Sequence, residues 1–89
     1  MPISSTQITL GTAASLIVNS YHNSQTVQLH NQNKSSNHYI FVGGSGVTSA
    51  TGIHIDPGED RTIEVPPGDE LYACSDPSGL VIGVLLIRR

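Results

Sequence analysis

The sequence has few of the residues on which several classes of protein depend. Its 89 residues include one cysteine, Cys74, no tryptophan and four basic residues, and the net charge is −3. A single cysteine forms no internal disulfide and no multi-cysteine metal site. Four basic residues cannot build the positive face that nucleic-acid binding needs. The composition therefore argues against a disulfide-stapled domain, a cysteine-based metal module and a nucleic-acid partner.

Long apolar runs are also missing from the sequence. The longest run extends from Leu80 to Ile87 and includes Gly83, whereas a membrane-spanning helix needs about 20 apolar residues. Residues 1–6 contain neither a basic region nor an apolar run. We therefore expect no signal peptide, no membrane partner and synthesis in a cytoplasm.

The residues that are present favour β-strands. Val, Ile and Thr total 23 residues, and β-branched side chains suit extended backbone. Apolar and polar residues alternate along 7–10, 26–30 and 61–65, which is the pattern of a strand with one buried face. The sequence predicts about eight strands, over residues 6–10, 14–19, 25–30, 38–42, 52–55, 61–65, 70–74 and 80–87.

Two of these strands are apolar on both faces, and turns separate the later ones. Residues 39–42 and 80–87 are expected to be central strands, or strands covered by another subunit. Pro57, Pro67 and Pro77 recur every ten residues beside glycines that supply positive φ in turns. Regularly spaced short strands predict a single all-β domain over 1–89, a small antiparallel sandwich or barrel of jelly-roll or immunoglobulin-like type.

The motifs that carry chemistry are weak. The histidines His22, His30, His38 and His54 have no metal-ligand spacing, and the acidic residues 56–60, 69–70 and 76 match no calcium loop. No nucleophile elbow or phosphate-binding loop occurs. We expect no enzyme activity, catalytic residue, metal or cofactor, and we expect Cys74 to be a buried small side chain. An open alternative is a carbohydrate-binding platform formed by Tyr21, Tyr39 and Tyr72.

The segment from Tyr39 to Ile87 carries a resemblance. It contains Val-Gly-Gly-Ser at 42–45, a Pro-Gly-Glu turn at 57–59, Gly-Asp-Glu-Leu-Tyr-Ala at 68–73 and a final Val/Leu-rich strand. In these features it resembles small β-rich virion proteins of tailed bacteriophages, such as capsid decoration (cement) proteins. The resemblance implies an all-β oligomer that stabilises the assembled head, located on the capsid surface and made in the host cytoplasm. The alternative function is a carbohydrate- or receptor-binding module on a phage tail or head fibre.

The resemblance also implies a protein partner, namely the major capsid protein or another virion protein, and the small core favours self-association. We expect a homotrimer, whose weak contacts with a shell would add through avidity. Residues 1–10 are uncharged, and within them Ile3, Ile8 and Leu10 are the candidate capsid or subunit contacts. The alternative is that these residues form only the first strand and a frayed end.

Overall fold

The structure, a computed structural model, describes residues 3–88. These residues form eight strands and no helix, and therefore no helix that could cross a membrane. The strands are β1 (Ile3–Leu10), β2 (Ser15–Val18), β3 (Gln25–Asn31), β4 (Tyr39–Gly43), β5 (Ile53–Ile55), β6 (Asp60–Val65), β7 (Leu71–Asp76) and β8 (Leu80–Arg88). The predicted all-β fold is confirmed, although β1 begins at Ile3 rather than at residue 6 and β7 extends to Asp76 rather than to residue 74.

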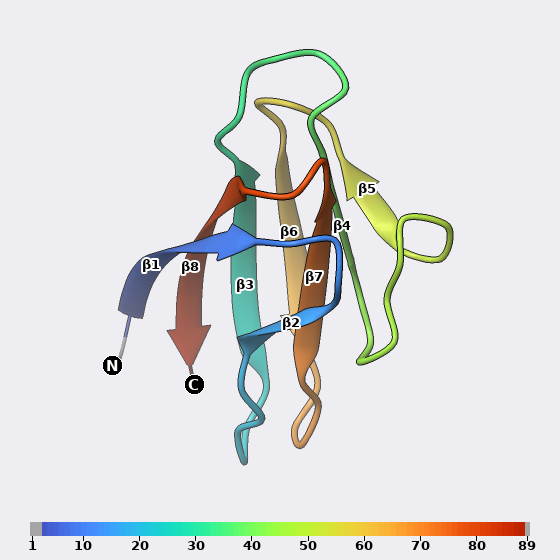
Figure 1. The fold of residues 1–89 in the computed structure, drawn as a ribbon. Coiled ribbons are helices and arrows are strands. Elements are labelled where there is room, and N and C mark those ends of the chain that lie inside the picture. The colour runs from blue at the N-terminus through green and yellow to red at the C-terminus, as the bar shows by residue number, and fades with distance from the viewer. Residues whose placement is uncertain (1–2, 89) are drawn as a thin grey trace.

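The strands pair as a nested series. β1 pairs with β8, β2 with β7, β3 with β6 and β4 with β5, always antiparallel. The chain therefore forms one long antiparallel hairpin whose turn lies between β4 and β5. It wraps so that β3 also pairs with β8, and β4 with β7. The result is two four-stranded sheets, ordered β1-β8-β3-β6 (sheet A) and β2-β7-β4-β5 (sheet B) (Figure 1). This is jelly-roll connectivity, one of the two sandwich types expected from the sequence.

The two strands that are apolar on both faces lie inside the sheets. β8 lies between β1 and β3, and β4 lies between β7 and β5. Both strands have a neighbour on each side, so the prediction of central strands is confirmed.

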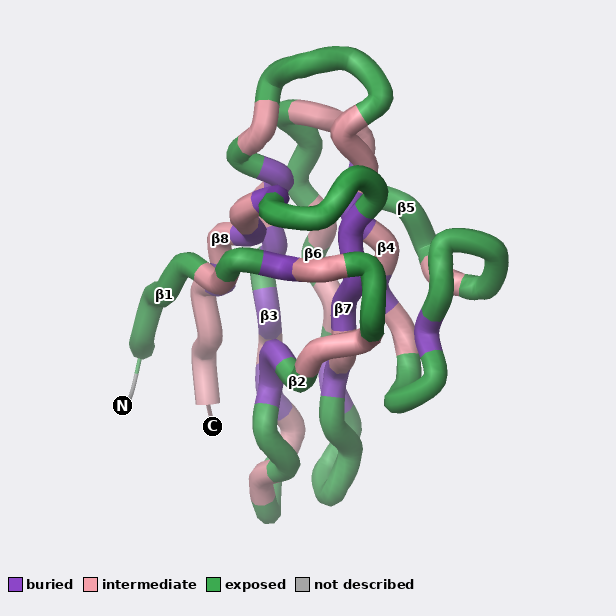
Figure 2. The backbone as a smooth tube through the Cα atoms, in the orientation of Figure 1, coloured by how far each residue is buried: buried purple, intermediate pink, exposed green. Residues whose placement is uncertain are grey.

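The core lies between the inner faces of the two sheets (Figure 2). Every second residue of β3 is buried, and β4 and the first five residues of β8 alternate in the same way. Full burial of one such aliphatic side chain stabilises the fold by roughly 1.5–3 kcal/mol. The core comprises Leu10, Ile17, Val18, Val27, Leu29, Ile40, Val42, Ile55, Val65, Leu71, Ala73, Leu80, Ile82 and Val84.

The turns have the predicted chemistry. Gly58 has φ of 78° and Gly68 has φ of 84°, and each follows a proline, Pro57 or Pro67. Proline fixes the preceding turn position near −65°, and glycine takes the left-handed position without a Cβ clash. These turns connect β5 to β6 and β6 to β7.

Candidate functional site

The outer face of sheet A is broad and carries little charge. Residues paired across strands share a face, so the buried residues of β3 and β8 identify the opposite, outward set. Leu85 and Ile87 lie on the central strand β8 of this face and are only partly exposed. Around them lie hydroxyl and amide side chains. The outward set is Ile3, Ser5, Gln7, Thr9, Val81, Gly83, Leu85, Ile87, Thr26, Gln28, His30, Asp60, Thr62 and Glu64.

A groove of about 430 Å³ crosses this face at Gly83. Gly83 pairs with Gln7 on β1 and with His30 on β3, and because it has no side chain the amide of Gln32 lies directly over it. A Cβ built on Gly83 would lie 2.8 Å from the Nε2 of Gln32. Amide side chains therefore line the groove, with Gln28 beside Gln7 and Gln32.

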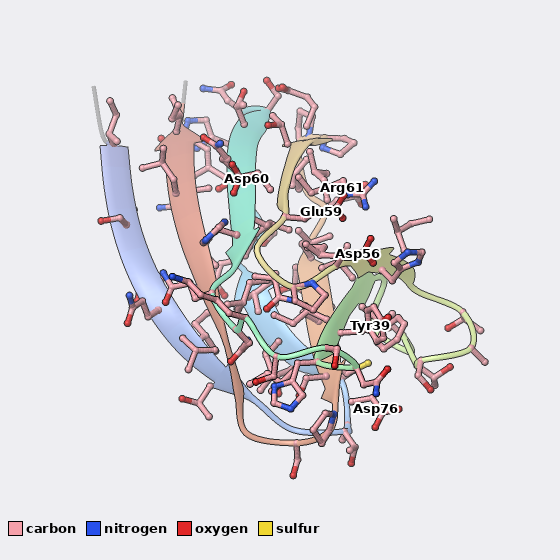
Figure 3. The ribbon with its side chains drawn as sticks, turned by 90° about the horizontal axis from the view of Figure 1, so that it is seen from above. Tyr39, Asp56, Glu59, Asp60, Arg61 and Asp76 are labelled. Carbon is pink, nitrogen blue, oxygen red and sulfur yellow. The ribbon has the colours of Figure 1, made fainter. Side chains whose placement is uncertain are left out.

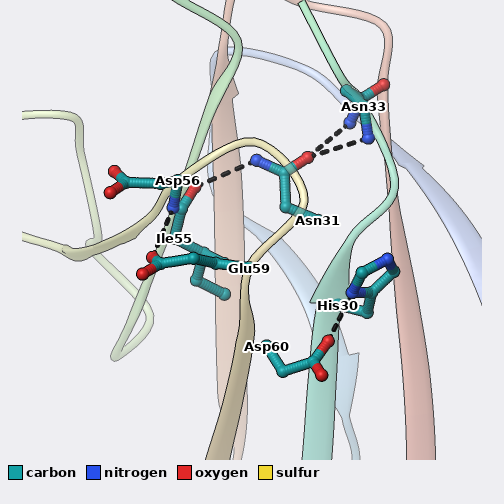
Figure 4. A network of polar contacts seen from close by, with 7 residues as sticks. All are labelled: His30, Asn31, Asn33, Ile55, Asp56, Glu59 and Asp60. Carbon is teal, nitrogen blue, oxygen red and sulfur yellow. Dashed lines mark hydrogen bonds and ion pairs between the residues drawn. The ribbon is translucent and has the colours of Figure 1, made fainter.

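The pair His30 and Asp60 lines the groove towards β6, where the His30 Nδ1 contacts an Asp60 carboxylate oxygen (Figure 4). Both side chains are half exposed, at 44% and 56%. Their strands are adjacent and their positions paired, so the contact is a cross-strand pair. The contact stabilises the side of the groove and holds the ring of His30 in place.

The buried Asn31 beside this pair has a structural role. Its Nδ2 donates to the carbonyl oxygens of His38 and Ile55, each at 2.9 Å. Its Oδ1 accepts from the backbone N–H and the Nδ2 of Asn33, at 3.1 Å and 2.8 Å (Figure 4). Asn31 is 0% exposed, and all of its side-chain hydrogen-bonding capacity is used. It joins the end of β3 to β5 and to the loop before β4.

The three candidate contact residues all lie on β1, but in different surroundings. Leu10 is 1% exposed and belongs to the core, and Ile8 is partly buried against it. Ile3 is 63% exposed and pairs with Ile87. Of the three side chains, Ile3 is the one fully available to a partner, and residues 3–10 together form the edge strand of sheet A.

Sheet B carries a smaller, aromatic depression on its outer face. Its volume is about 270 Å³, and Tyr39, Phe41, His54 and Asp56 line it. The rings of Tyr39 and His54 meet edge to face, with centroids 6.1 Å apart and planes at 86°. The Nε2 of His54 lies 3.2 Å from a carboxylate oxygen of Asp56. An aromatic surface beside a carboxylate can stack on the apolar face of a sugar and accept bonds from its hydroxyls.

The three tyrosines do not form one platform. Tyr39 and Tyr72 are both outward on sheet B, since Tyr72 pairs with Gly43 and Tyr39 with Asp76, but these positions are four residues apart along β4. Tyr21 lies beyond the end of β2, against His22 at 4.2 Å and beneath the guanidinium of Arg88 at 4.8 Å. Only Tyr39 lines the depression.

Two of the described side chains, Tyr72 and Cys74, have a pKa above the ordinary value. The hydrogen bond that the Tyr72 hydroxyl donates to Glu70, 3.2 Å long, raises the pKa of that hydroxyl. Burial raises the pKa of the Cys74 thiol, and the negative charge of Asp76 adds to the effect. Cys74 is 1% exposed, so the prediction of a buried cysteine is confirmed. A thiol in this state has little of the thiolate that nucleophilic chemistry uses.

The charged and metal-ligating residues are spread over the fold. Within residues 3–88, no group of three histidine, cysteine or acidic side chains is arranged to hold a metal ion. Asp56, Glu59, Asp60 and Arg61 gather around the β5–β6 turn, and Asp76 lies apart from them (Figure 3). Arg61 donates to the carbonyl oxygen of His54 at 2.6 Å, which joins β6 to β5. These charges are concentrated away from β1.

Sequence reasoning proposed contacts on residues 1–10 and did not predict the groove or the aromatic depression. The signal for the groove is Gly83, a glycine inside the apolar 80–87 strand, because such a glycine marks a close approach or a hollow. No sequence motif indicates the depression, because Tyr39 and His54 are far apart in the sequence. They come together only through the pairing of β4 with β5.

Comparison with known proteins finds a similar fold among solved structures. No family model matches the sequence, and no curated protein matches it. A solved structure from work on Bacillus endospore appendages, described as a novel family of disulfide-linked pili, has a similar fold, with a TM-score of 0.62 and 11% identity. The match covers 96% of this chain and 80% of that chain. At this identity the likeness establishes that the two chains share a fold.

Proposed function

We propose that this chain is a structural, non-enzymatic component of a protein assembly. The observation that carries the proposal is the outer face of sheet A, where hydroxyls, amides and the aliphatic residues Leu85 and Ile87 lie beside an edge strand with no charge. Uncharged groups of this kind can be buried against a partner at low desolvation cost when their hydrogen bonds are met. The fold shared with an appendage protein, which is described as forming pili, supports the same function.

We further propose a specific role, that of a capsid decoration (cement) protein of a tailed bacteriophage. The sequence features between Tyr39 and Ile87 support this role through their resemblance to small β-rich virion proteins. In this role the partner is the major capsid protein or another virion protein, and the location is the capsid surface. Decoration requires a stable scaffold with an adhesive face. Specific protein–protein interfaces of standard size bury about 1,600 Å² of accessible surface in total.

Reconstituted heads test this function. Purified protein is added to heads of the encoding phage from which this gene has been deleted, and binding is measured by cosedimentation. We expect saturable binding and a higher melting temperature of the heads. No cosedimentation, together with an unchanged melting temperature, would contradict the role in decoration.

A matched pair of variants tests whether sheet A is the adhesive face. Leu85→Lys places a charge on the outer face of sheet A, whereas Leu16→Lys places it on β2 of sheet B, where Leu16 is 40% exposed. We expect Leu85→Lys to weaken head binding at least tenfold and Leu16→Lys to leave it unchanged. Equal effects of the two variants would show that sheet A has no special part in the contact.

The second candidate function is saccharide binding at the depression of Tyr39, Phe41 and His54. It is favoured by the edge-to-face ring pair beside the Asp56 carboxylate. A glycan array separates it from the first function. Binding that is lost in Tyr39→Ala and retained in Tyr21→Ala would support a sugar site, because Tyr21 lies outside the depression. An array without any signal would refute it.

A further inference from the structure

The four edge strands of the sandwich differ in how they are protected from pairing with other chains. β1 and β6 form the edges of sheet A, and β2 and β5 form the edges of sheet B. An edge strand presents a row of unpaired N–H and C=O groups to any other strand. Proteins block such edges with charges, proline, bulges or very short strands.

Three of the four edges carry such a device. β6 contains Asp60, Arg61 and Glu64. β2 has four residues and a register shift between Leu16 and Val18. β5 has three residues. Each of these edges is therefore charged, irregular or short.

β1 has none of these devices. Its eight residues, Ile-Ser-Ser-Thr-Gln-Ile-Thr-Leu, include no charged residue, proline or glycine. Its register with β8 runs without a shift from Ile3↔Ile87 to Leu10↔Leu80. Most of the strand is exposed (Figure 2), and its free side has no hydrogen-bonded strand within the described part of the chain. It is a long, regular and open edge.

We propose that β1 pairs antiparallel with β1 of a second copy of this chain, which joins two copies of sheet A into one eight-stranded sheet. This inference deepens the proposed function, on which its biological meaning rests, by naming the surface through which copies associate. It replaces the homotrimer expected from the sequence with a two-fold dimer, because antiparallel pairing of identical strands is isologous and closes after two subunits.

Length and charge select a second β1 as the occupant. Another β1 can match the strand along nearly its whole length, whereas β2 offers four residues, β5 three and β6 six. The six residues of β6 include two acids and an arginine, and β1 has no charge with which to complement them. Two uncharged strands meet without repulsion, and their hydroxyl side chains can form cross-strand pairs.

The pleat fixes the register to two positions. Opposed residues of one sheet point to the same face, so an odd residue of β1 must oppose an odd residue of the partner. The two-fold axis then passes beside Thr6 or beside Gln7 for the longest overlap. In the first register Ser5 opposes the partner's Gln7, and in the second Gln7 opposes the partner's Gln7. In the second register Ser5 opposes the partner's Thr9, with the partner's Gln7 as a diagonal neighbour, so charges placed at positions 5 and 7 lie near their counterparts in both registers.

Charge-swapped variants of the isolated 89-residue chain test this pairing by sedimentation equilibrium. For wild type we expect a species of twice the 9.4 kDa chain mass that dissociates on dilution. Ser5→Lys/Gln7→Lys and Ser5→Glu/Gln7→Glu should each raise the dimer dissociation constant about tenfold or more through like-charge repulsion. An equimolar mixture of the two should restore dimers. The control, Gln28→Lys/Thr62→Lys, adds the same charge to a pair on β3 and β6 of the same face and should dimerise like wild type.

Hydrogen exchange of the wild-type chain keeps the test independent of whether the variants fold. Amides of β1 should lose protection on dilution, while those of the central strand β8 should not. A wild-type monomer at 100 µM, a trimer, an open polymer, or a mixture that fails to restore dimers from folded variants would each overturn the pairing. None of these measurements uses phage heads, so failure here is distinct from failure of head binding.

Discussion

Replacing Asn31 with alanine removes the buried amide that joins β3 to β5. The substitution leaves the carbonyl oxygens of Ile55 and His38 without the Nδ2 donor that lies 2.9 Å from each. It also removes the acceptor for two hydrogen bonds from Asn33. Asn31 and its bond to the carbonyl oxygen of Ile55 are fully buried, so water cannot replace that bond unless the end of the sandwich opens.

The cost follows from the number of groups left unpaired. A buried polar group without a partner costs about 1–3 kcal/mol, and the substitution affects two carbonyl groups. Asn33 is partly exposed and can turn its donors to water. We therefore expect Asn31→Ala to lower the free energy of unfolding by about 2–4 kcal/mol. For a domain of this size, each kcal/mol corresponds to roughly 4–8 °C in melting temperature.

Urea and thermal denaturation, followed by circular dichroism, measure this loss. The matched control is Asn33→Ala, which removes the bond of its Nδ2 to Asn31, a 3.1 Å bond to the carbonyl oxygen of Val81 and the Oδ1 acceptor of a 3.4 Å bond from the Val81 N–H. We expect a loss of about 1 kcal/mol or less for the control, because these groups are partly exposed. A loss below about 1 kcal/mol for Asn31→Ala, or equal losses for both variants, would refute the reasoning.

Three further predictions follow from the packing and titration of single residues. Gly52→Ala should destabilise the fold by about 1–3 kcal/mol, since its Cβ would lie 2.8 Å from the Phe41 Cβ and 3.2 Å from a backbone oxygen; Gly46→Ala, with nothing within 4 Å, should be neutral, and equal urea midpoints for the two would contradict this. The Cys74 thiol should react with a disulfide reagent at pH 8 only as fast as the protein unfolds, because this residue is 1% exposed and closed to the reagent, and the raised pKa slows any direct reaction further; rapid reaction of the native protein would mean that the site is open. The hydroxyl of Tyr72 should titrate above a free tyrosine in ultraviolet absorbance, and Glu70→Gln should bring its midpoint down; an unchanged midpoint would exclude the hydrogen bond as the cause.

The sequence pattern predicted the fold wherever side-chain burial alternates strictly. Val27 and Leu29 on β3, and Ile40 and Val42 on β4, are buried on alternate positions, and the Pro-Gly turns lie where they were expected. The choice between a jelly roll and an immunoglobulin-like sandwich was beyond the pattern, because both alternate in the same way. Strand order depends on pairing between strands that are distant in the sequence, such as β1 and β8. The alternation within each strand does not reveal that pairing.

Polar residues in structured positions explain the boundaries that were missed. Ser4 and Thr6 belong to the inner-facing set of β1, since they pair with Leu86 and Val84, yet both are exposed. The first half of β1 therefore lacks the alternation of apolar and polar residues that marks a half-buried strand. At the end of β7, Ser75 is 2% exposed because its Oγ donates to the carbonyl oxygen of Pro77 at 2.8 Å and contacts Leu10 and Gly11. Because the residues of both segments are polar, the hydrophobic pattern did not predict that they belong to strands.

The strand predicted over residues 25–30 stopped short of Asn31 for the same reason. Its partners His38 and Ile55 are distant in sequence, and a single sequence does not reveal that a polar side chain is buried among them. The candidate contacts on β1 illustrate the opposite case. The absence of charge over residues 1–10 selected this strand as the candidate contact, whereas only the structure separates the buried Leu10 from the exposed Ile3.

The most direct test of the proposed decoration role is to look for the chain in purified particles of a tailed phage that carries its gene. Mass spectrometry and cryo-electron microscopy of those particles give both the copy number and the position. We predict stoichiometric amounts of the chain, with density for a two-sheet sandwich on the outside of the shell and sheet A turned towards a neighbouring protein. Particles that contain no copy of the chain would contradict this role.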